Sequence, residues 1–208
     1  MQGVCHVVAA GSSEGFNLAL APGDFVIAAD GGYRTAIEAG IEPDLFVGDY
    51  DSLSPELVDS ISCDRVELPC AKDKTDTLVA LEEGMKRGYT EFHIHAALGG
   101  DVGHEIACVQ CLHYLREQGA FGFLHGHGQT VFILDENNGT FKLHEEPGTR
   151  LSVFSFASAA VGVEEHGTQW ELSGAVLKPG DSIGVSNKIV EDEVTLSVAS
   201  GALLVVVG

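Results

Sequence analysis

Two short apolar runs near the start of the chain each end abruptly in glycine and aspartate. Residues 25–29 lead into Asp30 and two glycines, and residues 45–47 lead into the segment Gly-Asp-Tyr-Asp-Ser. Runs of this length are typical of buried strands, and the segment between them has the length of one short helix. A strand, helix, strand unit predicts a parallel sheet. Since ligands bind at the carboxyl ends of such strands, we expect Asp30, Asp49 and Asp51 to converge on one crevice.

Three carboxylates that share one crevice repel one another unless a cation lies between them. Hard oxygen ligands of this kind suit Mg2+, which typically binds substrate phosphates alongside one or two carboxylates. The aspartates therefore predict a magnesium site that serves a ligand containing phosphate. The alternative is that they only cap helices and turns, which aspartate commonly does.

The alternation of strands and helices continues to about residue 127. Further strands are expected at residues 3–10, 64–69, 91–98 and 121–124, and further helices at residues 55–61, 78–85 and 104–115. Asp73 and Asp76 follow the strand at 64–69, so a third strand end carries aspartates, although Thr75 and Asp76 are equally suited to capping a helix. Residues 1–127 predict an α/β domain with a mostly parallel sheet.

From residue 128 onward only short strand-length runs occur, and Gly, Pro and Asn turns separate them. Strands are expected at residues 130–134, 139–143, 150–156, 182–185, 193–198 and 202–207. No segment of helical period intervenes. Residues 128–208 therefore predict an all-β domain, a sandwich or barrel. His125 and His127, at the exit of the preceding strand, are expected to be loop residues.

Composition excludes several classes of function. The chain has 11 Lys and Arg residues and 31 Asp and Glu residues. The resulting formal net charge of -20 argues against nucleic acid and anionic membranes as partners. No apolar run reaches the roughly 18 residues of a membrane span, and the N-terminus lacks the basic start of a secretory signal. We expect a soluble, cytoplasmic protein. The five cysteines have no framework spacing, so free thiols are expected.

One further group of residues has the spacing of a metal site. His104, Cys108 and Cys111 fall at i, i+4 and i+7 of an expected helix, which places them on one face that could hold zinc. A fourth ligand is not evident nearby. Buried thiols on an apolar helical face explain the same residues, and we prefer that interpretation.

Four segments, in this order, resemble those of the thiamin pyrophosphokinase family. They are Asp-Gly-Gly at 30–32, Pro-Asp…Gly-Asp-Tyr-Asp-Ser at 43–52, Lys-Asp-x-Thr-Asp at 72–76 and Gly…Ser-Asn at 184–187. The resemblance covers nearly the whole chain. It implies a catalytic α/β domain, a C-terminal β-sandwich, and transfer of the diphosphate of ATP to the hydroxyl of thiamin with Mg2+. It also implies a homodimer that binds thiamin between the α/β domain of one subunit and the sandwich of the other.

The resemblance also implies a role for each matching residue. The residues for magnesium and the diphosphate would be Asp30, Asp49, Asp51 and Asp76, the last three as metal ligands. The nucleotide would contact Gly31, Gly32, Lys72, Asp73, Thr75 and His104. Thiamin would contact Trp170, Ser186 and Asn187. The alternative for Trp170 is a position in the core of the β domain, where aromatic side chains are common.

Asp101 and Gly103 depart from the pattern of many family members, which have Arg and Asp at these positions. The loss of a cation beside the phosphates predicts weak ATP affinity. Two other classes of function stay open. Gly48 followed by Asp49 and Asp51 also suggests a magnesium phosphatase with an aspartyl nucleophile, and a thiamin or nucleotide binder without catalytic activity fits Asp101. Asp51 and Asp76 are both candidates for the base that accepts the hydroxyl proton.

Overall fold

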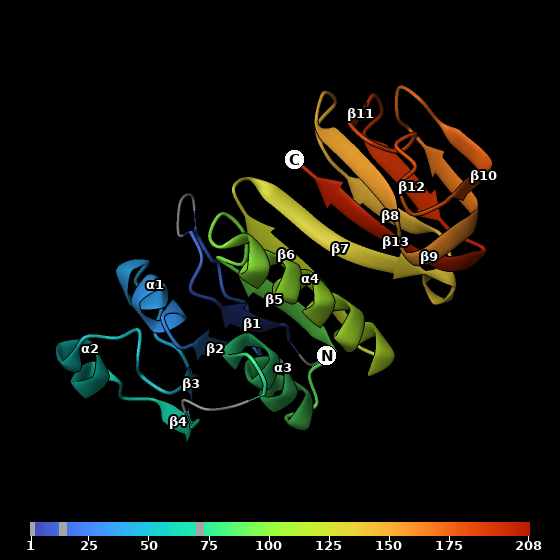
Figure 1. The fold of residues 1–208 in the computed structure, drawn as a ribbon. Helices are drawn as coiled ribbons and strands as arrows, with labels where there is room; N and C mark the ends of the chain where they lie inside the picture. The colour runs from blue at the N-terminus through green and yellow to red at the C-terminus, as the bar shows by residue number, and fades with distance from the viewer. Residues whose placement is uncertain (1–2, 13–15, 70–72) are drawn as a thin grey trace. The chain divides into compact units, whose positions relative to one another are not determined.

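The computed structural model describes residues 3–12, 16–69 and 73–208, and the chain divides into two compact units, Met1–Gly128 and Gln129–Gly208 (Figure 1). The strands of the first unit are β1 (Cys5–Val8), β2 (Phe25–Ala29), β3 (Leu45–Gly48), β4 (Asp64–Glu67), β5 (Glu91–His95) and β6 (Phe121–Gly126). Its helices are α1 (Gly32–Glu38), α2 (Pro55–Ser60), α3 (Asp76–Lys86) and α4 (Val102–Glu117). Lys72, one of the predicted nucleotide residues, lies outside the described residues.

The first unit contains the parallel sheet that the sequence predicts. Its strand order is β4-β3-β2-β1-β5-β6, and each pair of neighbouring strands that the structure describes is parallel. From β1 the chain adds strands in one direction up to β4, and it then returns to the other side of β1 with β5. The direction therefore changes between β1 and β5, which is where open α/β sheets bind ligands.

Helices cover both faces of this sheet. On one face α3 packs closely on the strands, since a Cβ atom added at Gly84 would lie 2.8 Å from Cys5 Sγ and 2.5 Å from the Phe92 ring. On the other face Ala36 of α1 belongs to the same buried cluster as Val8 and Val26. Figure 1 shows the four helices in blue to green around the strands of this unit.

Four histidine rings lie next to one another on the face that α1 covers at β1 and β2. They are His6, His93, His95 and His125, on β1, β5 and β6. The Nδ1 atom of His93 lies 2.8 Å from Nε2 of His125, and Nδ1 of His6 lies 3.1 Å from Nε2 of His95. The prediction that His125 is a loop residue is wrong, because it continues β6 and its ring stacks on that of His93 with centroids 4.9 Å apart.

The second unit is all-β, as predicted, and its strands pair antiparallel. Its strands are β7 (Gln129–Asp135), β8 (Phe141–His144), β9 (Arg150–His166), β10 (Leu172–Leu177), β11 (Asn187–Lys188), β12 (Glu193–Ser197) and β13 (Ser200–Val207), and the 3-10 helix η1 (Glu136–Asn138) follows β7. The strand order is β7-β13-β9-β12-β8, and both β10 and β11 pair with β9. The long strand β9 is therefore the centre of this unit.

Three predictions about this unit are wrong. The predicted strand at 182–185 is part of a turn, and the short strand β11 follows it. The strand that begins at Arg150 runs to His166, well beyond residue 156, and β10 was not predicted. Gly162 and Gly174 have φ angles of 66° and 62°. Such residues bend strands and break the apolar alternation on which a sequence prediction depends.

No helix in the described part of the chain is both long and apolar enough to cross a membrane. The cytoplasmic location stays a prediction.

Candidate active site

The aspartates that follow β2 and β3 form one carboxylate group. One carboxylate oxygen from each of Asp30, Asp49 and Asp51 lies within 4.8 Å of the others. The pairing of the strands explains this, because Ala29 lies opposite Val47 and the Asp30 N–H donates to Val47 O at 2.8 Å. Two neighbouring parallel strands therefore end together, as the sequence predicts.

Two residues in the loops that follow β2 and β3 have strained backbones. The φ angle is 45° at Asp30 and 68° at Tyr50, a region that few residues other than glycine adopt. The Tyr50 ring stacks on Phe46 with centroids 4.9 Å apart, and its hydroxyl donates to Glu67 Oε1 at 3.0 Å. These contacts anchor the turn that carries Asp49 and Asp51. Strain of this kind is concentrated at functional sites.

The carboxylate group fits a hard divalent cation. Oδ1 of Asp30 is buried, and no described group forms a hydrogen bond with it. An ionised oxygen in this position is costly unless a cation or a donor binds it. Asp76, the fourth predicted residue, is the first residue of α3 and is not a member of the group.

Arg34 is a residue that the sequence interpretation missed. It lies on α1, and its Nη2 atom donates to the backbone carbonyl of Ser52 at 2.5 Å. The helix that follows Asp30 therefore supports the loop that carries Asp49 and Asp51. No local sequence signal predicts a contact between a side chain and a backbone group 18 residues away.

Gly32 is required by packing within the first unit. A Cβ atom there would lie 1.9 Å from the backbone oxygen of Val8, which cannot move without distorting β1. We expect Gly32→Ala to lower the free energy of unfolding by about 3 kcal/mol, because overpacking against backbone has few means of relief. Gly100→Ala is the matched control, since its Cβ would meet nothing closer than 3.6 Å. Urea unfolding measures both, and equal stabilities would contradict this account.

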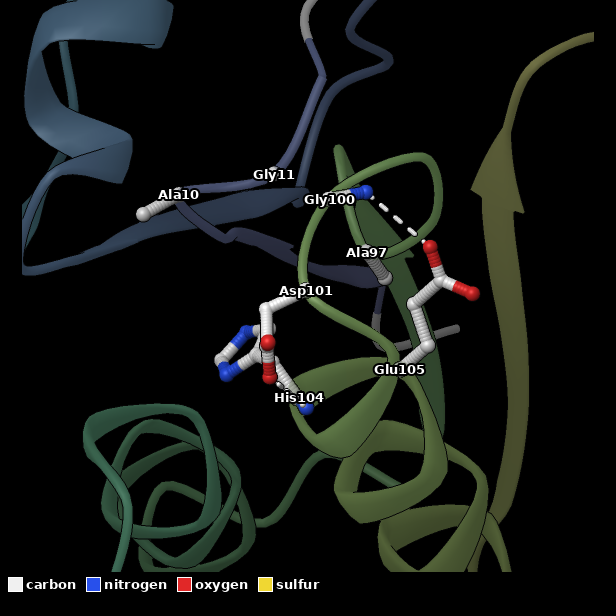
Figure 2. Close-up of a pocket in the computed structure, with 7 residues that line it drawn as sticks. All are labelled: Ala10, Gly11, Ala97, Gly100, Asp101, His104 and Glu105. Atoms are coloured by element: carbon white, nitrogen blue, oxygen red, sulfur yellow. Dashed lines mark hydrogen bonds between the residues drawn. The ribbon is translucent and has the colours of Figure 1, made fainter.

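A pocket of about 270 Å³ lies at the carboxyl ends of β1 and β5, where the strand order changes direction (Figure 2). It is lined by Ala10, Gly11, Ala97, Gly100, Asp101, His104 and Glu105. The pocket adjoins the carboxylate loops, because a Cβ atom at Gly31 would lie 3.0 Å from both Ala10 Cβ and Ser52 Oγ. A ligand in the pocket therefore lies beside the predicted metal site.

Two carboxylates accept hydrogen bonds from backbone N–H groups at, and just before, the start of α4. Asp101 is the N-cap of this helix and accepts from the His104 N–H at 3.1 Å. Oε1 of Glu105 accepts from the N–H groups of Gly99 and Gly100 at 2.7 and 3.0 Å. Figure 2 shows Glu105 pointing back to Gly100, with Asp101 and His104 on the other side of the loop. Glu105 was not among the predicted residues.

His104 offers the pocket a free ring nitrogen. Its Nε2 atom is buried and has no hydrogen-bond partner among the described groups, which suits contact with a ligand. Cys108 and Cys111 are buried, and burial raises the pKa of these thiols to about 12 and about 11. The interpretation of the two cysteines as buried thiols is therefore confirmed.

The segment that precedes α3 supplies a cap. Thr75 is the N-cap, and its side chain accepts from the Leu78 N–H at 3.2 Å. The capping alternative is therefore correct for Thr75. Asp73 is exposed. The nucleotide contacts of both residues stay predictions.

The predicted thiamin residues lie in the second unit. The side chain of Trp170 is 59% exposed, so its alternative position in the core is wrong. Ser186 is exposed, has a φ angle of 58°, and its N–H donates to Ser152 Oγ at 3.0 Å. Asn187 is only 4% exposed, and its side chain binds groups of its own unit.

Two family models match the sequence. Residues 16–121 match the model described as "Thiamin pyrophosphokinase, catalytic domain". Residues 140–203 match "Thiamin pyrophosphokinase, vitamin B1 binding domain". No curated protein matches the chain in sequence.

Solved structures resemble the whole chain. A thiamine pyrophosphokinase from Bacillus subtilis has a TM-score of 0.87 at 20% identity, over 98% of this chain and 97% of that one. A thiamin pyrophosphokinase family protein from Enterococcus faecalis has a TM-score of 0.85 at 24% identity, over 100% and 99%. Thiamin pyrophosphokinase from Candida albicans has a TM-score of 0.79 at 11% identity, over 99% and 88%. At these identities the likeness shows a shared fold.

Proposed function

The chain belongs to the thiamin pyrophosphokinase family, and we propose that the group of Asp30, Asp49 and Asp51 is its catalytic metal site. The family implies an ATP-dependent diphosphotransferase that converts thiamin to thiamin diphosphate. The observation that carries the proposal is the convergence of three carboxylate oxygens within 4.8 Å beside a pocket at the switch point of the sheet. Product analysis with ATP and thiamin tests it.

The reaction forms a bond between the thiamin hydroxyl oxygen and the β-phosphorus of ATP. The bond from the β-phosphorus to the bridging oxygen of AMP breaks, and the hydroxyl proton passes to a base, for which Asp51 and Asp76 are the candidates. When bound, Mg2+ would neutralise the charge on the transferred diphosphate. The residues of this chain position the groups for in-line transfer.

The pocket beside the carboxylate group is the proposed site of the nucleotide. The free Nε2 atom of His104 gives it one hydrogen-bonding group, and its small residues leave room for a ligand. Gly31 separates the pocket from the loop of Asp51. A nucleotide in the pocket would therefore direct its phosphates toward the three aspartates.

The second unit is the proposed source of the thiamin contacts. Trp170 offers an exposed ring for stacking, and the turn before Asn187 carries the exposed apolar side chains of Ile183 and Val185. We propose a homodimer in which thiamin contacts the α/β unit of one subunit and the β unit of the other, as the family resemblance implies. Sedimentation at micromolar concentration tests this, and a monomer that turns over thiamin would contradict it.

Asp101 is expected to weaken ATP binding. It adds a negative charge to a pocket that we assign to a triphosphate. Lys74, a cation of the segment before α3, is paired with Glu82 at 2.7 Å. We expect Asp101→Asn, which retains a capping oxygen, to tighten binding of Mg-ATP by about tenfold, since even a screened charge interaction has this magnitude. Isothermal titration measures the dissociation constant.

Asp101→Arg should tighten binding further and lower stability, because loss of the N-cap costs about 1 kcal/mol. Adding Gly103→Asp is compatible with this change, since the atom that its Cβ would crowd, Asp101 Oδ1 at 3.0 Å, is then absent. Asp59→Asn, at an exposed position of α2, is the control for net charge. Equal ATP affinity in the wild type, in both single variants of Asp101 and in the double variant would show that Asp101 does not face the phosphates.

A further inference from the structure

A buried side chain holds the backbone of Trp170, although the indole itself is exposed. Oδ1 of Asn187 accepts from the Trp170 N–H at 3.1 Å, and Nδ2 of Asn187 donates to the Trp170 carbonyl at 2.8 Å. The neighbouring residues pair as well, since the Gln169 N–H donates to Lys188 O at 2.8 Å. The backbone position of Trp170, from which the indole projects, therefore depends on the Asn187 amide together with this neighbouring pair.

The Asn187 amide is fixed in turn by two buried acceptors. Its Nδ2 atom lies 2.5 Å from Glu165 Oε1 and 3.0 Å from Thr168 Oγ1, so its two N–H groups are shared among these acceptors and the Trp170 carbonyl. Its Oδ1 atom also accepts from the Lys188 N–H at 2.8 Å. Both ends of the amide are thus engaged within the second unit. This favours a role for Asn187 in placing Trp170 over a direct hydrogen bond to a ligand.

Glu165 is an unusual residue to find at this point. It lies on β9 between Leu172 of β10 and Leu196 of β12, and its side chain is 0% exposed. Its Oε2 atom is buried without a hydrogen-bond partner among the described groups, and burial raises the pKa of the carboxyl group. A buried carboxyl group with an unsatisfied oxygen stabilises a fold less well than an apolar side chain of similar size. Its retention suggests a role other than stability.

We propose that Glu165 is a positioning residue for substrate recognition, which acts through Asn187 to fix the backbone of Trp170 and the orientation of its indole ring. The inference rests on the proposed function in one respect, namely that the indole contacts thiamin. It places a specificity determinant in the interior of the β unit, because Glu165 is fully buried. It predicts an effect on thiamin binding alone, since the carboxylate group and the pocket of the α/β unit do not depend on Glu165.

The test compares Glu165→Leu, which removes the acceptor, with Glu165→Gln, which retains an oxygen for Asn187. The chain has one tryptophan, so its fluorescence anisotropy reports on Trp170 alone. We expect Glu165→Leu to lower the anisotropy of the ligand-free protein and to raise the KM for thiamin about tenfold, the effect of leaving a buried group unpaired. The KM for ATP should stay at its wild-type value, and Glu165→Gln should restore both properties.

Glu191→Gln, which removes an exposed carboxylate outside this network, is the control. If Glu165→Leu does not fold, Thr168→Val removes the other acceptor and should cause a smaller change of the same kind. Wild-type anisotropy and wild-type KM for thiamin in Glu165→Leu would overturn the proposal, as would equal rises in the KM values for thiamin and ATP. If the wild type does not bind thiamin, the proposed function fails, while the anisotropy comparison still decides whether Glu165 positions Trp170.

Discussion

Replacing Asp49 or Asp51 by asparagine is expected to lower kcat for diphosphate transfer by about a thousandfold, because loss of a metal-binding charge removes several kcal/mol of transition-state stabilisation. Both side chains belong to the loop that follows β3, outside the hydrophobic core. The variants should therefore fold. Their melting temperatures without Mg2+ should equal or exceed that of the wild type, since each change relieves repulsion among three nearby carboxylates.

Steady-state kinetics over a range of Mg2+ concentrations measures the effect on catalysis. Asp59→Asn removes an equal charge from an exposed position on α2 and should leave kcat unchanged. The variants of Asp49 and Asp51 should also need more Mg2+ for half-maximal activity. Turnover near the wild-type rate in both variants would remove the carboxylate group from the catalytic site.

Lowering the pH from 7 to 5 is expected to destabilise the first unit through its histidine cluster. Burial and neighbouring histidines lower the pKa of His95 to about 3 and that of His125 to about 4, from an ordinary value of 6.5. Between pH 6.5 and these lowered pKa values, the unfolded chain binds protons that the folded chain does not. The stabilisation from the neutral histidines is therefore complete above pH 6.5 and is lost as the pH falls. Two such groups lower the free energy of unfolding by about 2.7 kcal/mol for each pH unit of acidification in this range.

The carboxylates of Asp24 and Glu91 face this cluster through His6 and His93, and they moderate the loss. Hydrogen exchange at the amides of β1 and β5 measures the stability of this unit. The variant His95→Gln should flatten its pH dependence, whereas His113→Gln, at a partly exposed position of α4 outside the cluster, should not. An unchanged pH dependence in His95→Gln would mean that the cluster accepts protons without cost.

The α/β fold could be predicted from sequence because its strands β1, β2 and β3 are buried on both faces. Such strands are continuous apolar runs, and β2 begins and ends at the residues that the sequence indicates. The β unit was harder to predict. Strand β9 contains Gly162 with a positive φ, and β10 follows with Gly174, so the apolar alternation is interrupted where the strands bend. The backbone decides such positions, and a pattern of apolar residues does not record them.

The candidate site divides in the same way. Asp30, Asp49 and Asp51 were predictable because Asp30 and Asp49 directly follow strands and Asp51 lies in the same loop as Asp49. Neighbouring strand ends meet at one edge of a sheet. Arg34 and Glu105 were not, because each side chain binds backbone groups, and any residue can supply a backbone group. Glu165 occupies a strand position where a charged residue is normally exposed, so its burial is visible only once the Asn187 network is assembled.

The most direct test of the central claim is a 31P NMR measurement of the products formed from ATP and Mg2+ with and without thiamin. The account predicts AMP and thiamin diphosphate in equal amounts, only when thiamin is present, and their absence in Asp49→Asn. Inorganic phosphate released without thiamin would identify a phosphatase. Tight binding of both substrates with no product would identify a binding protein, and either result would contradict the assignment of diphosphate transfer.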